Sequence, residues 1–111
     1  MDTERVYRVT VRGRFAALDD TKRSFLKRTQ PEHDLFKSAF TPEGTFTFDE
    51  RIQFFNFRYE LRTAEGDAAA GAMALAETTN FLSTLGLPHK GLKADVVDVS
   101  AIWDDPRIAR S

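Results

Sequence analysis

Residues 54–62 carry the sequence FFNFRYELR, in which apolar and polar side chains alternate from Phe55 onward. Successive side chains of a β-strand point to opposite faces, so this period of two predicts a strand with one buried face and one open face. The buried face takes Phe55, Phe57, Tyr59 and Leu61, and the open face takes Phe54, Asn56, Arg58, Glu60 and Arg62.

Three other stretches also have strand patterns. Residues 6–15 and 45–49 alternate between apolar and polar side chains, and residues 92–99 are rich in valine. The turn Thr41-Pro42-Glu43-Gly44 has proline at its second position and glycine at its fourth, as type I turns prefer. A polar connection around Glu50 and Arg51 joins residues 45–49 to residues 54–62, and these two strands are expected to pair as a hairpin. The aromatic core is expected to contain Phe15, Phe46, Phe48, Phe55, Phe57 and Tyr59.

A first helix is predicted over residues 20–29, with Asp19-Asp20 supplying the N-cap. Its buried side is expected to include Phe25 and Leu26. Residues 35–40 are ambiguous, because their apolar side chains fit a helical stripe while their flanks also permit a short strand. The helical interpretation is favoured.

A second, longer helix is predicted over residues 68–85. Glu65-Gly66-Asp67 precedes it as a capping segment, and Gly86 closes it in the position where helices commonly end in glycine. Its buried stripe follows spacings of three and four residues. That stripe consists of Gly71, Leu75, Thr78, Leu82 and Leu85.

The predicted elements follow the order β-α-β-β-α-β, which is the ferredoxin-like arrangement of an α+β protein. In this fold both helices cover one face of a four-stranded antiparallel sheet, and the other face stays open. A chain of 111 residues can bury one core without disulfides or metal. We expect a single ferredoxin-like domain over residues 1–111, with residues 100–111 as an irregular tail. Pairing into a dimeric α+β barrel, and hence a homodimer, is the expected assembly.

Composition removes several classes of function. The chain has no cysteine, so a disulfide framework, a thiolate zinc site and a cysteine nucleophile are all excluded. Its net charge of −1 supplies no overall field that would attract nucleic acid or an anionic membrane. The N-terminal residues do not resemble a signal peptide, and no apolar run approaches the length of a membrane span. A cytoplasmic protein without membrane or nucleic-acid partners is expected.

The open face of the predicted sheet supplies the candidate ligand-binding residues, Arg12, Phe54, Asn56 and Arg58. Arginines that converge on a sheet can bind an anionic group through paired hydrogen bonds. The alternative is a solvated face on which arginines pair with carboxylates across the strands. Phe54 alone is a poor platform for stacking bases, so RNA recognition is not expected.

His33 and Asp34 are the candidate catalytic residues, because a histidine beside a carboxylate can serve as a general acid or base. The alternative is a capping or surface role, since adjacent helical residues point in different directions. His89 is isolated in sequence from His33 and has no partner at metal-ligand spacing, so no metal site is expected. The chain lacks nucleotide-binding motifs, so no cofactor is expected.

Several stretches together resemble a known family. They are Val9-Thr10-Val11-Arg12-Gly13-Arg14-Phe15, His33-Asp34, Phe40-Thr41-Pro42-Glu43-Gly44 and Phe55-Asn56-Phe57-Arg58. The family consists of short bacterial proteins described only as a domain of unknown function. The similarity runs from about Val6 to Val99 and is most distinctive in the turn and its flanking phenylalanine. The resemblance implies a compact cytoplasmic domain and carries over no catalytic residue. The tail from Trp103 to Ser111 departs from the family pattern.

Fold analogy then suggests a small-molecule-binding protein whose ligand is a hydrophobic or aromatic metabolite held between sheet and helices. Cofactor-independent cyclisation, isomerisation or oxygenation of that metabolite is the associated enzyme hypothesis, and whether the protein is an enzyme stays open. The alternative is a non-catalytic protein-interaction module that uses the open sheet face or the tail around Trp103. A cavity that opens toward a histidine or carboxylate would favour the first hypothesis.

Overall fold

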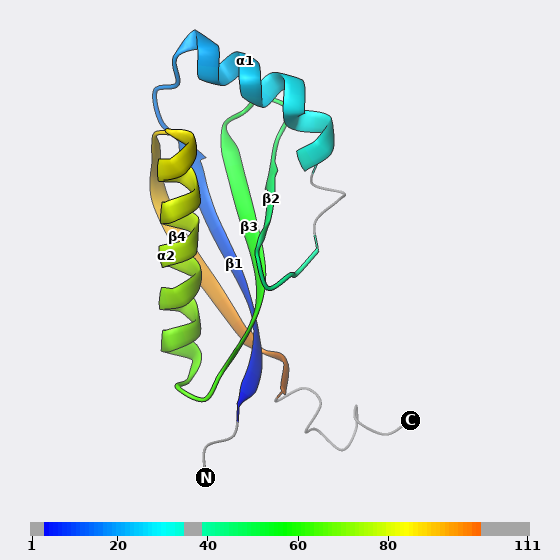
Figure 1. Ribbon diagram of the computed structural model, residues 1–111, viewed down its shortest axis with the longest axis vertical. Coiled ribbons are helices and arrows are strands. Elements are labelled where there is room, and N and C mark those ends of the chain that lie inside the picture. Colours follow the sequence, from blue (N-terminus) through cyan, green and yellow to red (C-terminus); the bar gives the residue numbers. More distant parts are fainter. Residues whose placement is uncertain (1–3, 35–38, 101–111) are drawn as a thin grey trace.

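The computed structural model describes residues 4–34 and 39–100, which form an open sheet with helices packed against it (Figure 1). The interpretation of residues 35–40 falls largely outside these ranges, as does the tail from residue 101 onward. Within the described ranges the elements are β1 (Arg5–Phe15), α1 (Asp20–Thr29), the short 3-10 helix η1 (Gln30–His33), β2 (Thr45–Phe48), β3 (Phe54–Thr63), α2 (Asp67–Leu85) and β4 (His89–Asp98).

The sheet has the strand order β2-β3-β1-β4, and every neighbouring pair is antiparallel. The long strands β1 and β3 lie at its centre because their sequences alternate over ten or more residues and can bury one face throughout. The predicted α+β, ferredoxin-like fold is confirmed.

The two helices contribute to one core but lie differently on it (Figure 1). Helix α2 runs lengthwise along the sheet and packs mainly on β4 and β1. Small side chains permit this close approach: a Cβ atom added to Gly71 would lie 3.2 Å from Cγ2 of Val96. Helix α1 lies crosswise at one end of the sheet. The part of this face over β2 and β3 is therefore only partly covered by helix.

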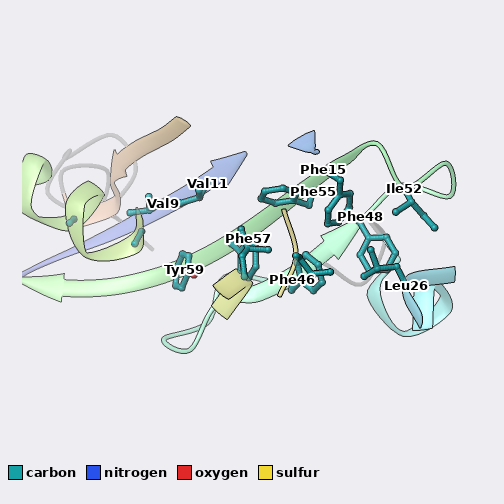
Figure 2. Close-up of a cluster of buried hydrophobic side chains, with 14 of the residues drawn as sticks. Val9, Val11, Phe15, Leu26, Phe46, Phe48, Ile52, Phe55, Phe57 and Tyr59 are labelled. Atoms are coloured by element: carbon teal, nitrogen blue, oxygen red, sulfur yellow. The ribbon is translucent and has the colours of Figure 1, made fainter. Parts of the chain in front are cut away.

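The buried side chains form an aromatic row along β2 and β3 (Figure 2). The rings of Phe46 and Phe57 stack with centroids 4.7 Å apart, and Phe57 and Tyr59 stack at 6.2 Å. Leu26 of α1 packs at the far end of this row, beside Phe48. The six predicted core aromatics, namely Phe15, Phe46, Phe48, Phe55, Phe57 and Tyr59, are all buried.

Two predicted core positions on the helices are wrong. Phe25 is 39% exposed, because the crosswise helix α1 turns the neighbouring Leu26 toward the core. Leu85 is also exposed, at the last turn of α2, whereas Leu82 one turn earlier and Leu87 just after the helix are buried. The buried stripe of α2 instead starts earlier and consists of Ala70, Gly71, Ala74, Thr78 and Leu82.

The outer edge of the sheet at β2 is covered by side chains from η1. Nδ1 of His33 lies 3.0 Å from the carbonyl oxygen of Phe46, and Nε2 of Gln30 donates to the carbonyl oxygen of Phe48 at 3.4 Å. These carbonyls belong to alternate residues of an edge strand and point away from β3. Hydrogen-bonding them protects an edge that would otherwise attract another strand.

Candidate functional site

The four candidate ligand-binding residues all lie on the open face, on the central strands β1 and β3. Arg12 is directly opposite Asn56 in the strand register, and Arg14 is opposite Phe54. Arg58 is opposite Thr10, one side-chain row further along. The strand pairing therefore gathers Arg12, Asn56 and Phe54 in neighbouring rows, as the alternation predicts.

Cross-strand ion pairs account for part of the charge on this face. Nε of Arg8 lies 3.2 Å from Oε1 of Glu60, which is one of the pairs expected for a solvated face. Nη1 of Arg12 lies 3.0 Å from Oδ2 of Asp95, with both side chains more than 60% exposed. Exposed pairs of this kind contribute about 1 kcal/mol or less. These ion pairs give the side chains of this face a preferred orientation but add little to the stability of the fold.

Arg58 is held by an aromatic ring. Cζ of Arg58 lies 5.5 Å from the ring centroid of Phe40, and Cζ of Arg8 lies 5.1 Å from the same centroid. Within the described ranges, Nε of Arg58 is a buried nitrogen with no hydrogen-bond partner. Arg58 therefore packs into the sheet face through cation–π contact more than it extends toward solvent.

A hollow of about 230 Å³ lies beside Arg12, where β1 meets β4. We call it the basic hollow. Its lining residues are Arg12, Gly13, Arg14, Phe54, Gly91, Lys93 and Asp95. Arg12 and Phe54 thus share one hollow, whereas Asn56 and Arg58 are not among its lining residues.

A second hollow, of about 370 Å³, lies on the helix face of the sheet between α2, β3 and the turn that precedes β2. We call it the aromatic groove. Its lining residues are Glu43, Gly44, Phe57, Tyr59, Glu77, Asn80, Phe81 and Thr84. The lining residues place this groove beside α2, over the part of β3 that α1, lying crosswise at the end of the sheet, does not cover.

Tyr59 fixes the inner wall of the aromatic groove. Its ring is buried beside Phe57 (Figure 2). Its hydroxyl lies 2.8 Å from the hydroxyl of Thr78 on α2. Burial raises the pKa of Tyr59 above its ordinary value, and the negative charge of Glu77 raises it further, while the hydrogen bond to Thr78 opposes both. The phenol is therefore neutral at physiological pH and acts as a hydrogen-bonding group.

Gly44 keeps the groove open. Its φ of +90° lies in the region that glycine adopts readily, and its N–H donates to the carbonyl oxygen of Thr41 at 3.2 Å. A Cβ atom at this position would lie 2.3 Å from Cε1 of Tyr59. The turn predicted at residues 41–44 is present, and only a residue without a side chain fits against the tyrosine ring.

Comparison with protein-family models finds one that matches residues 1–108, described as Family of unknown function (DUF6204). The chain belongs to this family. No curated protein and no solved structure matches it. The resemblance to a domain of unknown function is confirmed.

The structure places the catalytic candidates of this DUF6204 chain away from both hollows. Nδ1 of His33 is bonded to the Phe46 carbonyl, and its ring stacks on Phe48 with centroids 5.6 Å apart. Asp34 follows at the end of η1 and also has an interaction partner. Neither residue lines the basic hollow or the aromatic groove. A catalytic role for this pair stays a prediction.

Other candidate chemistry in the DUF6204 chain is limited. Nδ1 of His89 lies 3.0 Å from the carbonyl oxygen of Leu87, a local contact at the start of β4. Over residues 4–34 and 39–100, no group of three or more histidine, aspartate or glutamate side chains is arranged to hold a metal ion. No helix in the same ranges is both long and apolar enough to cross a membrane.

The aromatic groove was missed by sequence analysis, although two signals for it exist. Phe81 lies outside the predicted buried stripe of α2, which places an aromatic side chain on the helix surface, although a single exposed apolar residue is common and does not by itself mark a binding surface. Gly44 is the last residue of a turn and precedes a strand, so its role in the groove could not be distinguished from ordinary turn geometry. The tertiary position of α1 decides that these residues line a hollow.

Proposed function

We propose that this DUF6204 chain binds a small aromatic molecule in the aromatic groove. The supporting observation is the combination of three aromatic side chains and a few polar groups around about 370 Å³ of space. Ligand pockets typically have volumes of about 300–1,000 Å³, apolar walls and a small number of polar groups that orient the ligand. The aromatic groove has each of these properties.

The arrangement of the rings favours an aromatic ligand. Phe57 and Phe81 make an edge-to-face contact with centroids 5.2 Å apart, and Phe57 stacks on Tyr59. Phe81 is 39% exposed, so part of its ring surface faces solvent. A ligand ring inserted here would cover exposed aromatic surface and add a ring contact worth about 0.5–1.5 kcal/mol beyond area burial.

The charges at the rim favour a ligand that carries a hydrogen-bond donor or a positive charge. Glu43 and Glu77 are carboxylates, and none of the described lining residues is a lysine or arginine. A cation beside these carboxylates would also lie near the aromatic rings, which attract positive charge through their faces. We therefore propose an aromatic amine, or a ring bearing N–H or O–H groups, as the ligand class.

Proton transfer is the reaction class that these rim groups could support. A carboxylate within reach of a bound ligand can accept a proton and return it, as isomerisation and cyclisation require. Glu77 is the candidate because its charge acts on Tyr59 at the groove wall. Ligand binding is the first part of the proposal and is tested independently of turnover.

The test begins with native mass spectrometry of the purified chain, which detects a co-purified molecule and the subunit count together. Two probes of matched size and opposite charge, 2-phenylethylamine and phenylacetate, are then titrated into labelled protein and followed by NMR. We expect saturable shifts of the Gly44 and Phe81 amides, with the amine binding more tightly. Failure of both probes to bind, together with native spectra that show no adduct, would overturn the proposal.

A pair of phenylalanine variants localises the binding. Phe81→Ala removes a groove wall and should weaken 2-phenylethylamine binding by about fivefold or more, since an aromatic contact of about 1 kcal/mol or more is lost. Phe25→Ala is the matched control, because Phe25 is equally exposed on α1 and does not line the groove. Equal losses in the two variants would place the probe elsewhere.

The interaction-module hypothesis keeps one specific observation in its favour. Phe54 and Val97 are about half exposed, and both lie on the open sheet face, opposite Arg14 and Arg8 in the strand register. Two such side chains could contribute to a contact with a second copy of the chain. A dimer in the native spectra that is lost in Val97→Lys would support a self-association surface on this face, and it would leave ligand binding in the aromatic groove to be decided by the probe titrations.

A further inference from the structure

We propose that the basic hollow is a second binding site, which takes a small anionic group carried on a planar ring. The site lies on the open face of the sheet, opposite to the face that carries the aromatic groove. The proposal for the basic hollow can therefore be tested independently of the function proposed for the aromatic groove.

A β-bulge creates the hollow. Arg12 pairs with Lys93 across β1 and β4, but two positions further along β1 Arg14 pairs with Lys90, so one extra residue of β4 lies between them. Gly91 takes part in this irregularity with a φ of +70°, and a Cβ atom added to it would have no neighbour within 4 Å. Such bulges redirect side chains and recur next to functional sites. Here the bulge leaves open space beside two arginines.

The lining has a strong local excess of positive charge. Arg12, Arg14 and Lys93 carry three positive charges, and Asp95 supplies one negative charge, which leaves +2 around the hollow. The chain as a whole has a net charge of −1. The hollow is therefore a site that attracts anions on a protein whose overall charge does not.

The arginines are available to a ligand. Arg12 interacts with Asp95 through a single exposed contact of 3.0 Å, which an incoming anion can replace at little cost. Cζ of Arg14 lies 5.2 Å from the ring centroid of Phe54, a contact that orients the guanidinium group without using its N–H donors. Arginine donors bind planar carboxylates and phosphates through two parallel hydrogen bonds.

Phe54 indicates the chemistry of the part of the ligand beyond its anionic group. Its side chain is half exposed, which is unusual for phenylalanine, and it forms an apolar wall of the hollow. The volume of about 230 Å³ lies below the range of drug-sized ligands. A single aromatic ring that carries one carboxylate or phosphate group matches this size and these walls.

The test is an NMR titration with benzoate and phenyl phosphate, which separate the two sources of the anionic group. Both should shift the Gly13 and Gly91 amides saturably, and the tighter probe identifies the preferred group. Inorganic phosphate should bind more weakly because it lacks the ring, and phenol should not bind because it lacks the charge. The absence of saturable shifts with both ring anions would overturn the proposal.

Matched charge variants distinguish a built site from diffuse attraction. Arg14→Gln should weaken binding of the tighter probe by about tenfold or more, because charge-assisted hydrogen bonds are lost. Lys93→Gln, made as a separate variant, should also weaken binding of this probe. Arg62→Gln is the control, because Arg62 is an exposed arginine on the same face of β3 and does not line the hollow. Equal effects of Arg14→Gln and Arg62→Gln would overturn the proposal.

The contribution of the ring is isolated by Phe54→Leu. This variant should weaken benzoate and phenyl phosphate binding but leave inorganic phosphate binding unchanged. Circular dichroism and thermal unfolding of each variant confirm that it folds, since all of these side chains are exposed. Loss of inorganic phosphate binding to the same degree would contradict a ring contact with Phe54.

Discussion

The hydroxyl of Tyr59 on strand β3 lies 2.8 Å from the hydroxyl of Thr78 on helix α2, and both side chains are buried. This polar contact joins the centre of the sheet to the long helix inside an otherwise apolar core. Tyr59→Phe would leave the Thr78 hydroxyl without this partner in a buried place. We expect a loss of about 1–3 kcal/mol in the free energy of unfolding, measured by urea denaturation. The double variant Tyr59→Phe/Thr78→Val should recover part of this loss, and a neutral single variant would contradict the assignment.

Tyr59 should also make stability fall at alkaline pH. Burial holds its pKa in the folded protein above the value of about 10 expected when the chain is unfolded. Its contribution is therefore fully present below pH 10 and is lost as the pH rises through the folded-state pKa. Ultraviolet absorbance of a Tyr7→Phe variant isolates the ionisation of Tyr59. Ionisation at the pH of free tyrosine would contradict this prediction.

Gly44 and Gly66 provide a matched pair of substitutions. Both have φ near +100°, but an added Cβ atom would collide with the Tyr59 ring at position 44 and would meet nothing within 4 Å at position 66. Gly66→Ala should therefore cost only backbone strain, about 1–3 kcal/mol, because φ of 101° with ψ of 178° is a conformation adopted almost only by glycine. Gly44→Ala should cost clearly more and should also narrow the aromatic groove. Thermal unfolding of the two variants compares these costs, and equal values would show that the ring can move away.

His33 should stabilise the edge of the sheet. His33→Ala removes the hydrogen bond to the Phe46 carbonyl and the ring contact with Phe48, with an expected loss of about 1–3 kcal/mol. Hydrogen exchange at the amides of β2 should accelerate. His89→Ala is the control, because His89 contacts the nearby Leu87 carbonyl and meets Phe55 edge-on at the longer centroid distance of 6.4 Å, and its effect should be smaller. A larger effect at His89 would contradict the edge-covering role.

Asp19 should make the stability of helix α1 depend on pH in the acid range. The backbone N–H of Lys22 donates to its carboxylate at 2.8 Å, and this bond is the main reason that the pKa of Asp19 is lowered. The stabilisation is present above the unfolded-state pKa near 4 and is lost as the pH falls through the folded value. Thermal unfolding of Asp19→Asn between pH 7 and pH 2 should show a weaker pH dependence than the wild type. An unchanged dependence would rule out this cap as its source.

Three of the four strands could be predicted to within one residue because burial of one face forces a period of two, whereas β4 begins at His89, three residues before the predicted start at residue 92. The 54–62 pattern matches β3 to within one residue, and the pattern of residues 6–15 matches β1 equally well. The start of α1 was also predictable, since the Asp19 cap is a local signal. Which of Phe25 and Leu26 is buried could not be predicted, because it depends on how helix α1 crosses the end of the sheet.

The candidate sites could likewise be predicted only in part: the local sequence pattern places single residues on a face, whereas the hollows depend on tertiary structure. Arg12 and Phe54 were identified on the open face by alternation alone, but the hollow between them depends on the bulge at Gly91. A glycine beside a valine-rich strand is a signal for such a bulge. The aromatic groove joins Gly44, Tyr59 and Phe81 from three separate elements, and no local pattern connects them.

The contact between Gly44 and the Tyr59 ring has a consequence for how this family can vary. A methyl group at position 44 cannot coexist with the tyrosine ring in its present place. Substitutions at the two positions should therefore be coupled among family members, with a larger residue at 44 accompanied by a smaller one at 59. Such pairs would mark the branches of the family in which the groove has been filled or reshaped for a different occupant.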